Sequence, residues 1–473
     1  MRYAAACAGV AMAVAVGGDA RAWEAETTHA GLAERAVLAS SLGDRLGEHF
    51  DFDMGLYEPL AISPAEAPAL FESLGLLNPT HGYVPDGDGE HWVLGWLVAG
   101  AVLADIPAAH AVHHAYDPLR GAGFSSDTLG ASLGHRLAAR AAGATLHRSG
   151  MAATEWLVHA DNPLSLDRFL DQYEGAVAAR SRAARSRHAA GMLLAAGGIV
   201  HVVQDTASPA RARDDRAAML RRIGRDRADA GSRFERLASL AFGRLGVPRA
   251  VRAIPLRPAL RDYITTPEGE GLADLASRAF FSDKTLPRPI DASVDTRPDV
   301  LEERLRASLR RPHPRPSAAL DLRRAASEEG ARLLDASGVC LAQYALRDGE
   351  LRWSIPDDCA LEQAAALLAQ ASAYGAGVID WLFRGELQLE ERGGAIEVTS
   401  AAIGLAEVTV TLLAEDADGA RAPVARIEET GGAAGEILAR FDAAAAGEGR
   451  VVALVRGVDE HGEPIVATGQ LSR

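Results

Sequence analysis

The stretch HWVLGWLVAGAVLAD, residues 91–105, carries apolar side chains on nearly every side of the helix that it predicts. A helix without a polar face is typical of the centre of a bundle, because a surface helix keeps one side in water. Residues 189–205 have the same character and also end in an aspartate, Asp205. Two such helices predict one large helical core.

The composition favours the same architecture. The chain has 473 residues, 48% of them hydrophobic and 24% charged, which is enough for two or three domains. Alanine and leucine are abundant while aromatic residues make up only 5%, and this balance favours helix over sheet. We therefore predict a mainly α fold, a multi-helix bundle, with a helical block over residues 318–382 and a proline-rich surface excursion over residues 286–316.

The pattern changes after Glu386. Apolar and polar side chains alternate in residues 387–389, 396–398 and 408–412. Short alternating strands at this spacing predict a small C-terminal β-sandwich. The predicted domains are a signal peptide over residues 1–22, a helical domain over residues 23–385 and the β-sandwich over residues 386–473.

The first residues have the pattern of an export signal. Arg2 precedes an apolar run over residues 4–16, and the small-x-small sequence Ala20-Arg21-Ala22 follows. We predict cleavage before Trp23 and a secreted or periplasmic protein; the alternative is a short buried helix. No other stretch reaches the length of a transmembrane helix.

The cysteines fit an oxidising compartment. Removal of the signal would take away Cys7 and leave one pair, Cys340 and Cys359. Outside the cytosol such a pair is able to form a disulfide. The alternative is two unpaired buried thiols.

The ends of the two apolar helices carry candidate metal ligands. His201 and Asp205 are four residues apart, so a helix places both side chains on one face. Asp105 ends the other helix, where a carboxylate beside so much apolar surface needs a cation or hydrogen bonds. With His114 these residues make a set that could close one tetrahedral site. The alternatives are a surface ion pair and a polar loop.

A second set of ligands lies at the predicted N-terminus. Cleavage before Trp23 would free its α-amino group, and an amine with its own carbonyl oxygen can chelate a metal ion. His29 follows within one or two helical turns. Processing would therefore create a ligand.

These segments together resemble the zinc-dependent phospholipase C and single-strand nuclease family. The resemblance covers roughly residues 23–235 and includes the run His114-Ala115-Tyr116-Asp117-Pro118, the loop at residues 161–165 and the helix that ends at Asp205. It implies two zinc ions and a shared water as the nucleophile. The first ion would take Asp105, His114, His201 and Asp205, and the second would take the Trp23 amine and carbonyl, His29 and Asp205 as a bridge.

The chain departs from this family at its third zinc site. Where the family has a histidine two residues after Pro209, this chain has Arg211, which cannot lose its proton to bind a metal. Glu235 is the candidate remnant of that site, which we expect to be empty. We assign catalytic roles to Asp105 and to Arg211, the latter as a fixed cation for a phosphate oxygen; the alternative is an Arg211 paired with Asp214 or Glu235.

The predicted function is that of a secreted zinc-dependent phosphodiester hydrolase of the phospholipase C type. The net charge of −15 disfavours polyanions such as nucleic acid, because such binding depends on basic surfaces, so phospholipid is preferred as substrate. Two alternatives stand beside this prediction. One is a catalytically impaired secreted binding protein, and the other is a nuclease-type activity.

Overall fold

The structure is a computed structural model, and it describes residues 25–50, 52–78, 82–107, 110–125, 151–215, 232–246, 252–291, 323–327, 330–335, 337–447 and 449–472. The predicted signal peptide and Trp23 lie outside these residues. The helices are η1 (Ala25–His29), α2 (Ala30–Ala39), α3 (Leu42–Phe50), η2 (Gly55–Tyr57), α4 (Pro68–Leu74), α5 (Val93–Leu103), η3 (His110–His113), α7 (Ala153–Trp156), α8 (Leu166–Val177), α9 (Arg182–Asp205), α10 (Pro209–Ala212), α12 (Arg233–Ala241), η5 (Phe242–Arg244), η6 (Leu260–Tyr263), α13 (Leu272–Ala279), α15 (Asp357–Leu382) and η7 (Ala443–Ala446).

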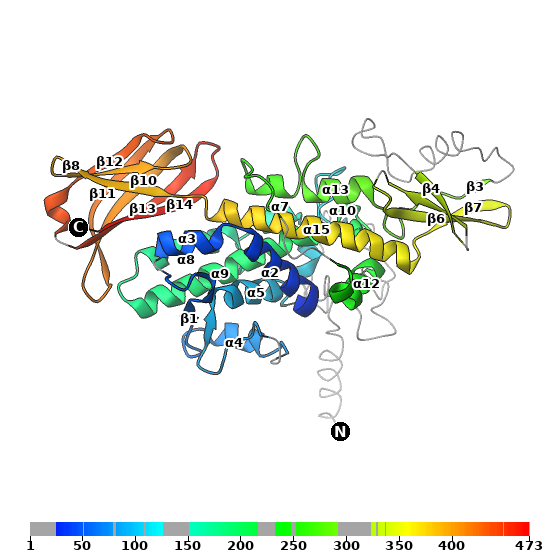
Figure 1. The fold of residues 1–473 in the computed structure, drawn as a ribbon, viewed down its shortest axis with the longest axis horizontal. Coiled ribbons are helices and arrows are strands. Elements are labelled where there is room, and N and C mark those ends of the chain that lie inside the picture. Colours follow the sequence, from blue (N-terminus) through cyan, green and yellow to red (C-terminus); the bar gives the residue numbers. More distant parts are fainter. Residues whose placement is uncertain are drawn as a thin grey trace, which may run out of the picture.

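The two apolar helices α5 and α9 lie at the centre of the helical part, with α2, α8 and α15 around them (Figure 1). Two glycines let them approach closely. A Cβ atom at Gly100 would lie 2.1 Å from the Leu194 carbonyl oxygen, and one at Gly197 would lie 1.9 Å from the Leu97 carbonyl oxygen. This contact between backbones brings the C-terminal ends of both helices together.

The prediction of a mainly α fold is wrong, because the chain mixes helix and strand: helices make up 41% and strands 24%. The described strands form four sheets, and one of them is a five-stranded sheet with the order β3-β7-β6-β5-β4. Its strands are β3 (Ile290–Asp291), β4 (Arg323–Ser327), β5 (Gly330–Leu334), β6 (Cys340–Arg347) and β7 (Glu350–Ser354). Strands β4 to β7 lie in the first part of the block 318–382 that we predict to be helical, whereas the second part of that block is the helix α15.

A tight turn between β6 and β7 explains the difference. Arg347 pairs with Glu350, and the two residues between them, Asp348 and Gly349, have φ values of 54° and 77°. Positive φ at both central positions gives the turn the twist that antiparallel strands need, and Asp-Gly is a favoured sequence there. The helix-forming composition of this segment is thus overridden by a local turn signal and by strand pairing.

A disulfide between Cys340 of β6 and Cys359 of α15 links the five-stranded sheet to the long helix. At its other end, α15 leads into the C-terminal strands (Figure 1). The helix ends at Leu382, and the next residues include Gly385, whose missing side chain leaves room for the Val466 carbonyl oxygen. Both ends of α15 are therefore tied to a sheet.

The C-terminal strands form two sheets around a separate apolar core (Figure 1). One sheet has the order β11-β10-β13-β14 and the other β12-β9-β8. The strands are β8 (Leu387–Arg392), β9 (Ala395–Ser400), β10 (Leu405–Glu415), β11 (Arg421–Gly432), β12 (Ile437–Asp442), β13 (Arg450–Asp459) and β14 (Pro464–Ser472). A fourth, small sheet pairs β1 (Pro59–Ala61) with β2 (Glu90–Trp92) beside α5.

Charged side chains attach the C-terminal sheets to the helices. Arg384, just after α15, forms a buried ion pair with Asp459 at 3.0 Å. Arg421 of β11 is buried and donates a hydrogen bond to the Val177 carbonyl oxygen at the end of α8.

None of the described helices is both long and apolar enough to cross a membrane.

Candidate metal centre

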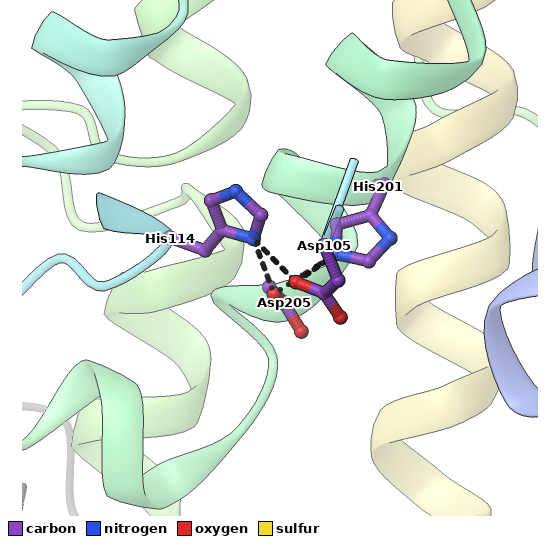
Figure 2. Close-up of side chains that lie close together, drawn as sticks. All are labelled: Asp105, His114, His201 and Asp205. Atoms are coloured by element: carbon purple, nitrogen blue, oxygen red, sulfur yellow. Dashed lines mark hydrogen bonds and ion pairs between the residues drawn. The ribbon is translucent and has the colours of Figure 1, made fainter. Parts of the chain in front are cut away.

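The ends of α5 and α9 meet at a buried cluster of four potential metal ligands (Figure 2). His201 and Asp205 lie on the last two turns of α9, Asp105 follows α5, and His114 follows η3. One ligand atom from each residue lies within 4.8 Å of the other three. The structure therefore brings together the four residues that the sequence proposes for one metal ion.

The spacing of the ligand atoms suits a tetrahedral ion. Asp205 Oδ2 lies 2.9 Å from His114 Nδ1 and 3.2 Å from His201 Nε2. Asp105 Oδ1 lies 3.4 Å from each of the same two nitrogens. Ligands about 2.0 to 2.1 Å from a tetrahedral zinc ion are about 3.3 Å apart from one another. The four side chains could thus hold an ion with little movement.

Asp105 gives independent support for a cation. It is 2% exposed, and no group of the described residues donates a well-aligned hydrogen bond to either of its carboxylate oxygens. A buried carboxylate that accepts no well-aligned hydrogen bond is costly, and the cost falls when a cation binds it. His114 Nδ1 and His201 Nε2 each lie 3.4 Å from Asp105 Oδ1, but neither contact has the geometry of a good hydrogen bond.

The charges of the cluster favour a positive group between the two carboxylates. Burial opposes a charge on His201, but the carboxylates of Asp105 and Asp205 outweigh burial and raise its pKa to about 10. Burial acts against ionisation of Asp205 as well, yet Arg211, His201 and His29 hold its pKa well below the usual range. A metal ion would take the place of the His201 proton, as binding to imidazole requires.

His29 lies on the opposite oxygen of Asp205. It ends η1, and its Nε2 atom lies 3.2 Å from Asp205 Oδ1. Its ring stacks on that of His201, with the ring centres 3.7 Å apart. Asp205 therefore faces two histidines through Oδ2 and one, His29, through Oδ1. Trp23, the other predicted ligand on this side, lies outside the described residues.

Arg211 lies inside the same cluster and has no exposed surface. Its Nε atom lies 3.2 Å from Glu235 Oε1, and its Nη1 atom lies 3.4 Å from Asp205 Oδ2. Nη1 also donates a hydrogen bond of 2.8 Å to the Ala111 carbonyl oxygen. Of the two partners that the sequence left open for Arg211, the structure shows Glu235, while Asp214 pairs with Arg120.

The residues around Glu235 do not fit a third metal ion. Oε2 of Glu235 accepts a hydrogen bond from the Ser232 backbone N–H, and Oε1 faces Arg211. The Ser232 hydroxyl in turn caps the backbone N–H of Glu235. This arrangement is a capping box, and the sequence Ser232-Arg233-Phe234-Glu235 is a local signal for it. Glu235 thus caps the start of α12 and pairs with Arg211.

One residue of the site has no signal in the sequence. It is Ala111, whose carbonyl oxygen accepts a hydrogen bond from Arg211 and so positions the guanidinium. A backbone acceptor has no signature in a side-chain pattern, so only the folded chain reveals it.

Comparisons of this chain with protein-family models, with curated proteins and with solved structures found no match. The assignment of the site therefore depends on the positions and contacts of these residues.

Proposed function

We propose that this chain is a zinc-dependent phosphodiester hydrolase of the phospholipase C type. The observation that supports the proposal best is the position of Asp205 between two groups of ligands. Its Oδ2 atom faces His114 and His201, and its Oδ1 atom faces His29. A carboxylate with this arrangement suits a bridge between two metal ions, as in two-metal hydrolytic sites.

Zinc is the ion that we propose for the first site. Two imidazole nitrogens and two carboxylate oxygens are ligands that zinc accepts in a four-coordinate site. The hard ions Mg²⁺ and Ca²⁺ prefer sites made mainly of oxygen atoms, so two histidines argue against them. For the second ion we propose His29, the shared Asp205 and the amine and carbonyl of Trp23.

The chain's own residues would hold and orient the reacting groups. Asp105 and Asp205 supply negative charge to the ions, and the buried helix ends keep these carboxylates in place. Bound zinc would supply Lewis acidity, which makes water a nucleophile at neutral pH and neutralises charge on a phosphate. Arg211 Nη2 forms no hydrogen bond with the described residues, so we propose that it donates to a phosphate oxygen.

The proposed substrate is a phospholipid, ahead of nucleic acid. The chain carries a net charge of −15, which opposes the binding of an extended polyanion. A single phosphodiester needs only local positive charge, and the ions with Arg211 would provide it. The preference for lipid also draws on the resemblance of the run from His114 to Pro118 to the phospholipase branch of the family.

A second candidate function has its own support. The four ligands and Arg211 are all 2% exposed or less, and Arg211 is engaged with Glu235 and the Ala111 carbonyl oxygen. A closed site with a cation tied between carboxylates also suits a structural metal. In that case the chain would be a secreted binding protein without turnover.

The two proposals differ in metal content and in activity. Purified protein is assayed for zinc per chain by mass spectrometry and for hydrolysis of bis(4-nitrophenyl) phosphate, phosphatidylcholine and single-stranded DNA. We expect two zinc ions, hydrolysis that stops when the zinc is removed, and faster turnover of the lipid than of DNA. One zinc with no hydrolysis of any substrate would support the binding protein, and no zinc at all would contradict both proposals.

A further inference from the structure

A second feature of the helical part is a pocket of about 640 Å³ between α4, α8, α9 and the segment that follows α5. Its size falls in the range of small-molecule sites, which is about 300 to 1,000 Å³. None of the four clustered metal ligands lines it. On α9 the lining ends at Leu194, seven residues before His201, which is about 10 Å of helix. The pocket therefore contains none of the four metal ligands, although Leu103 and Ile106, on either side of Asp105, line it.

The floor of the pocket is apolar. Ile62, Leu103 and Leu194 line it and are 4%, 6% and 5% exposed. Leu164 also lines it and packs against Gly198 of α9, where a Cβ atom would lie 2.5 Å from that of Leu164. An apolar floor of this kind favours a hydrocarbon body, because the ligand leaves water without a loss of hydrogen bonds.

The rim of the same pocket is basic. Arg168 of α8 is exposed, and no carboxylate of the described residues forms an ion pair with it. Arg187 and His188 of α9 line the pocket as well. Arg187 forms an ion pair of 2.8 Å with Glu66, and His188 Nδ1 shares a hydrogen bond of 3.0 Å with Gln172 Oε1. One acid and two arginines leave the rim with a positive charge, although the chain as a whole carries −15.

We propose that this pocket binds an anionic amphiphile: a single hydrocarbon chain on the apolar floor and a carboxylate or phosphate head at Arg168. The floor and the rim each select one part of such a ligand. An exposed guanidinium can move toward the head and donate two parallel hydrogen bonds to it. This inference stands apart from the proposed hydrolase activity, since it needs neither zinc nor turnover.

The probes are decanoate and decyl phosphate, with decyltrimethylammonium as the matched cation, each titrated into the full protein in a calorimeter below its micelle concentration. We expect one anion per chain and binding of the cation at least about ten-fold weaker, because a like charge at the rim opposes it. The two anions distinguish a carboxylate head from a phosphate head. Equal binding of anion and cation would overturn the proposal, and so would no binding of either anion.

Two variants locate the site. Arg168→Gln should weaken binding of the anion roughly three- to ten-fold, while Arg180→Gln, an exposed arginine just beyond α8 that does not line the pocket, should leave binding unchanged. Ala69→Trp adds an indole from an exposed position of α4 at the pocket and should abolish binding. Binding that survives both Arg168→Gln and Ala69→Trp, in proteins whose thermal unfolding matches the parent, would place the anion elsewhere.

Failure of this proposal is distinguishable from failure of the hydrolase proposal. Asp205→Asn removes a metal ligand but no pocket residue, so decanoate should bind to it as to the parent. Loss of decanoate binding in Asp205→Asn, with unfolding unchanged, would show that the anion occupies the metal centre instead and would overturn the separate site.

Discussion

His29 and Asp205 lie far apart in the sequence but touch in the buried centre of the molecule, with His29 Nε2 3.2 Å from Asp205 Oδ1. His114 and His201 approach the other oxygen of the same carboxylate. One aspartate therefore connects a histidine near the N-terminus to the pair that closes the first site.

Asp205→Ala and His29→Ala should differ in their zinc content. Asp205 contacts both groups of ligands, so its loss should remove both ions, whereas loss of His29 should remove only the second. We expect fewer than about 0.2 zinc ions per chain in the first variant and about one in the second, since removal of an essential ligand lowers affinity by orders of magnitude. His461→Ala, at an exposed histidine, is the control. Equal and mild effects of Asp205→Ala and His29→Ala would contradict the bridge.

Binding of the second zinc ion should depend on the N-terminus that cleavage before Trp23 creates. If export cleaves the chain before Trp23, then one additional residue in front of Trp23 would separate the free amine from the carbonyl that completes the chelate. Such an extended chain should bind one zinc ion and not two. The measurements are N-terminal sequencing of the secreted protein and zinc per chain. A secreted form that starts elsewhere and holds two zinc ions would rule out this ligand.

Loss of Arg211 should lower both turnover and the free energy of unfolding, and the two effects have different causes. Arg211→Ala removes a donor from the site and should lower turnover on the order of 100-fold or more, with zinc content unchanged. It also leaves Glu235 buried without its partner, which should cost roughly 3 to 5 kcal/mol of unfolding free energy.

The double variant Arg211→Gln with Glu235→Gln separates these effects. It removes both charges, so much of the stability should return while turnover stays low. Urea unfolding and hydrolysis of bis(4-nitrophenyl) phosphate measure the two quantities. Turnover at the parent's rate in Arg211→Ala would make Arg211 a structural residue only.

His49 should make the protein sensitive to acid. It is buried and shares a hydrogen bond of 2.8 Å with the Tyr173 hydroxyl. Burial, with a contribution from Arg45, lowers its pKa from 6.5 to about 3. Between these values the unfolded chain binds a proton that the folded chain does not, so stability falls as pH decreases from 6.5 toward 3, by up to about 1.4 kcal/mol per pH unit.

His49→Gln keeps a polar partner for Tyr173 but does not titrate, so it should reduce the loss of stability in acid. The measurement is the free energy of unfolding in urea at several pH values between 3 and 7. His461→Gln, at an exposed position, should follow the parent curve. A His49→Gln curve with the same slope as the parent would show that other groups cause the acid sensitivity.

Local patterns in the sequence were enough for the two central helices and for the strands β8, β9 and β10. A continuous apolar run indicates a helix buried on all sides, and strict alternation indicates a strand buried on one face. Neither pattern requires knowledge of which other elements pack against the segment. The spacing of His201 and Asp205 also predicts their shared face, because a helix repeats every 3.6 residues. The sequence does not predict the five-stranded sheet, because the alanine, leucine and arginine in its strands are good helix formers and the turn at Asp348-Gly349 connects only two of the strands, β6 and β7.

The partners of the buried charges were decided by tertiary structure. The sequence leaves Arg211 with Asp214 or Glu235 as partner, and the fold selects Glu235 because the start of α12 and the Ala111 carbonyl oxygen meet at the guanidinium. The contact between His29 and Asp205 likewise exists only once η1 and the end of α9 pack together. A sequence pattern specifies which side chains share a helix face, but distances between ligands on different helices depend on how the backbones pack, here through the close approach at Gly100 and Gly197.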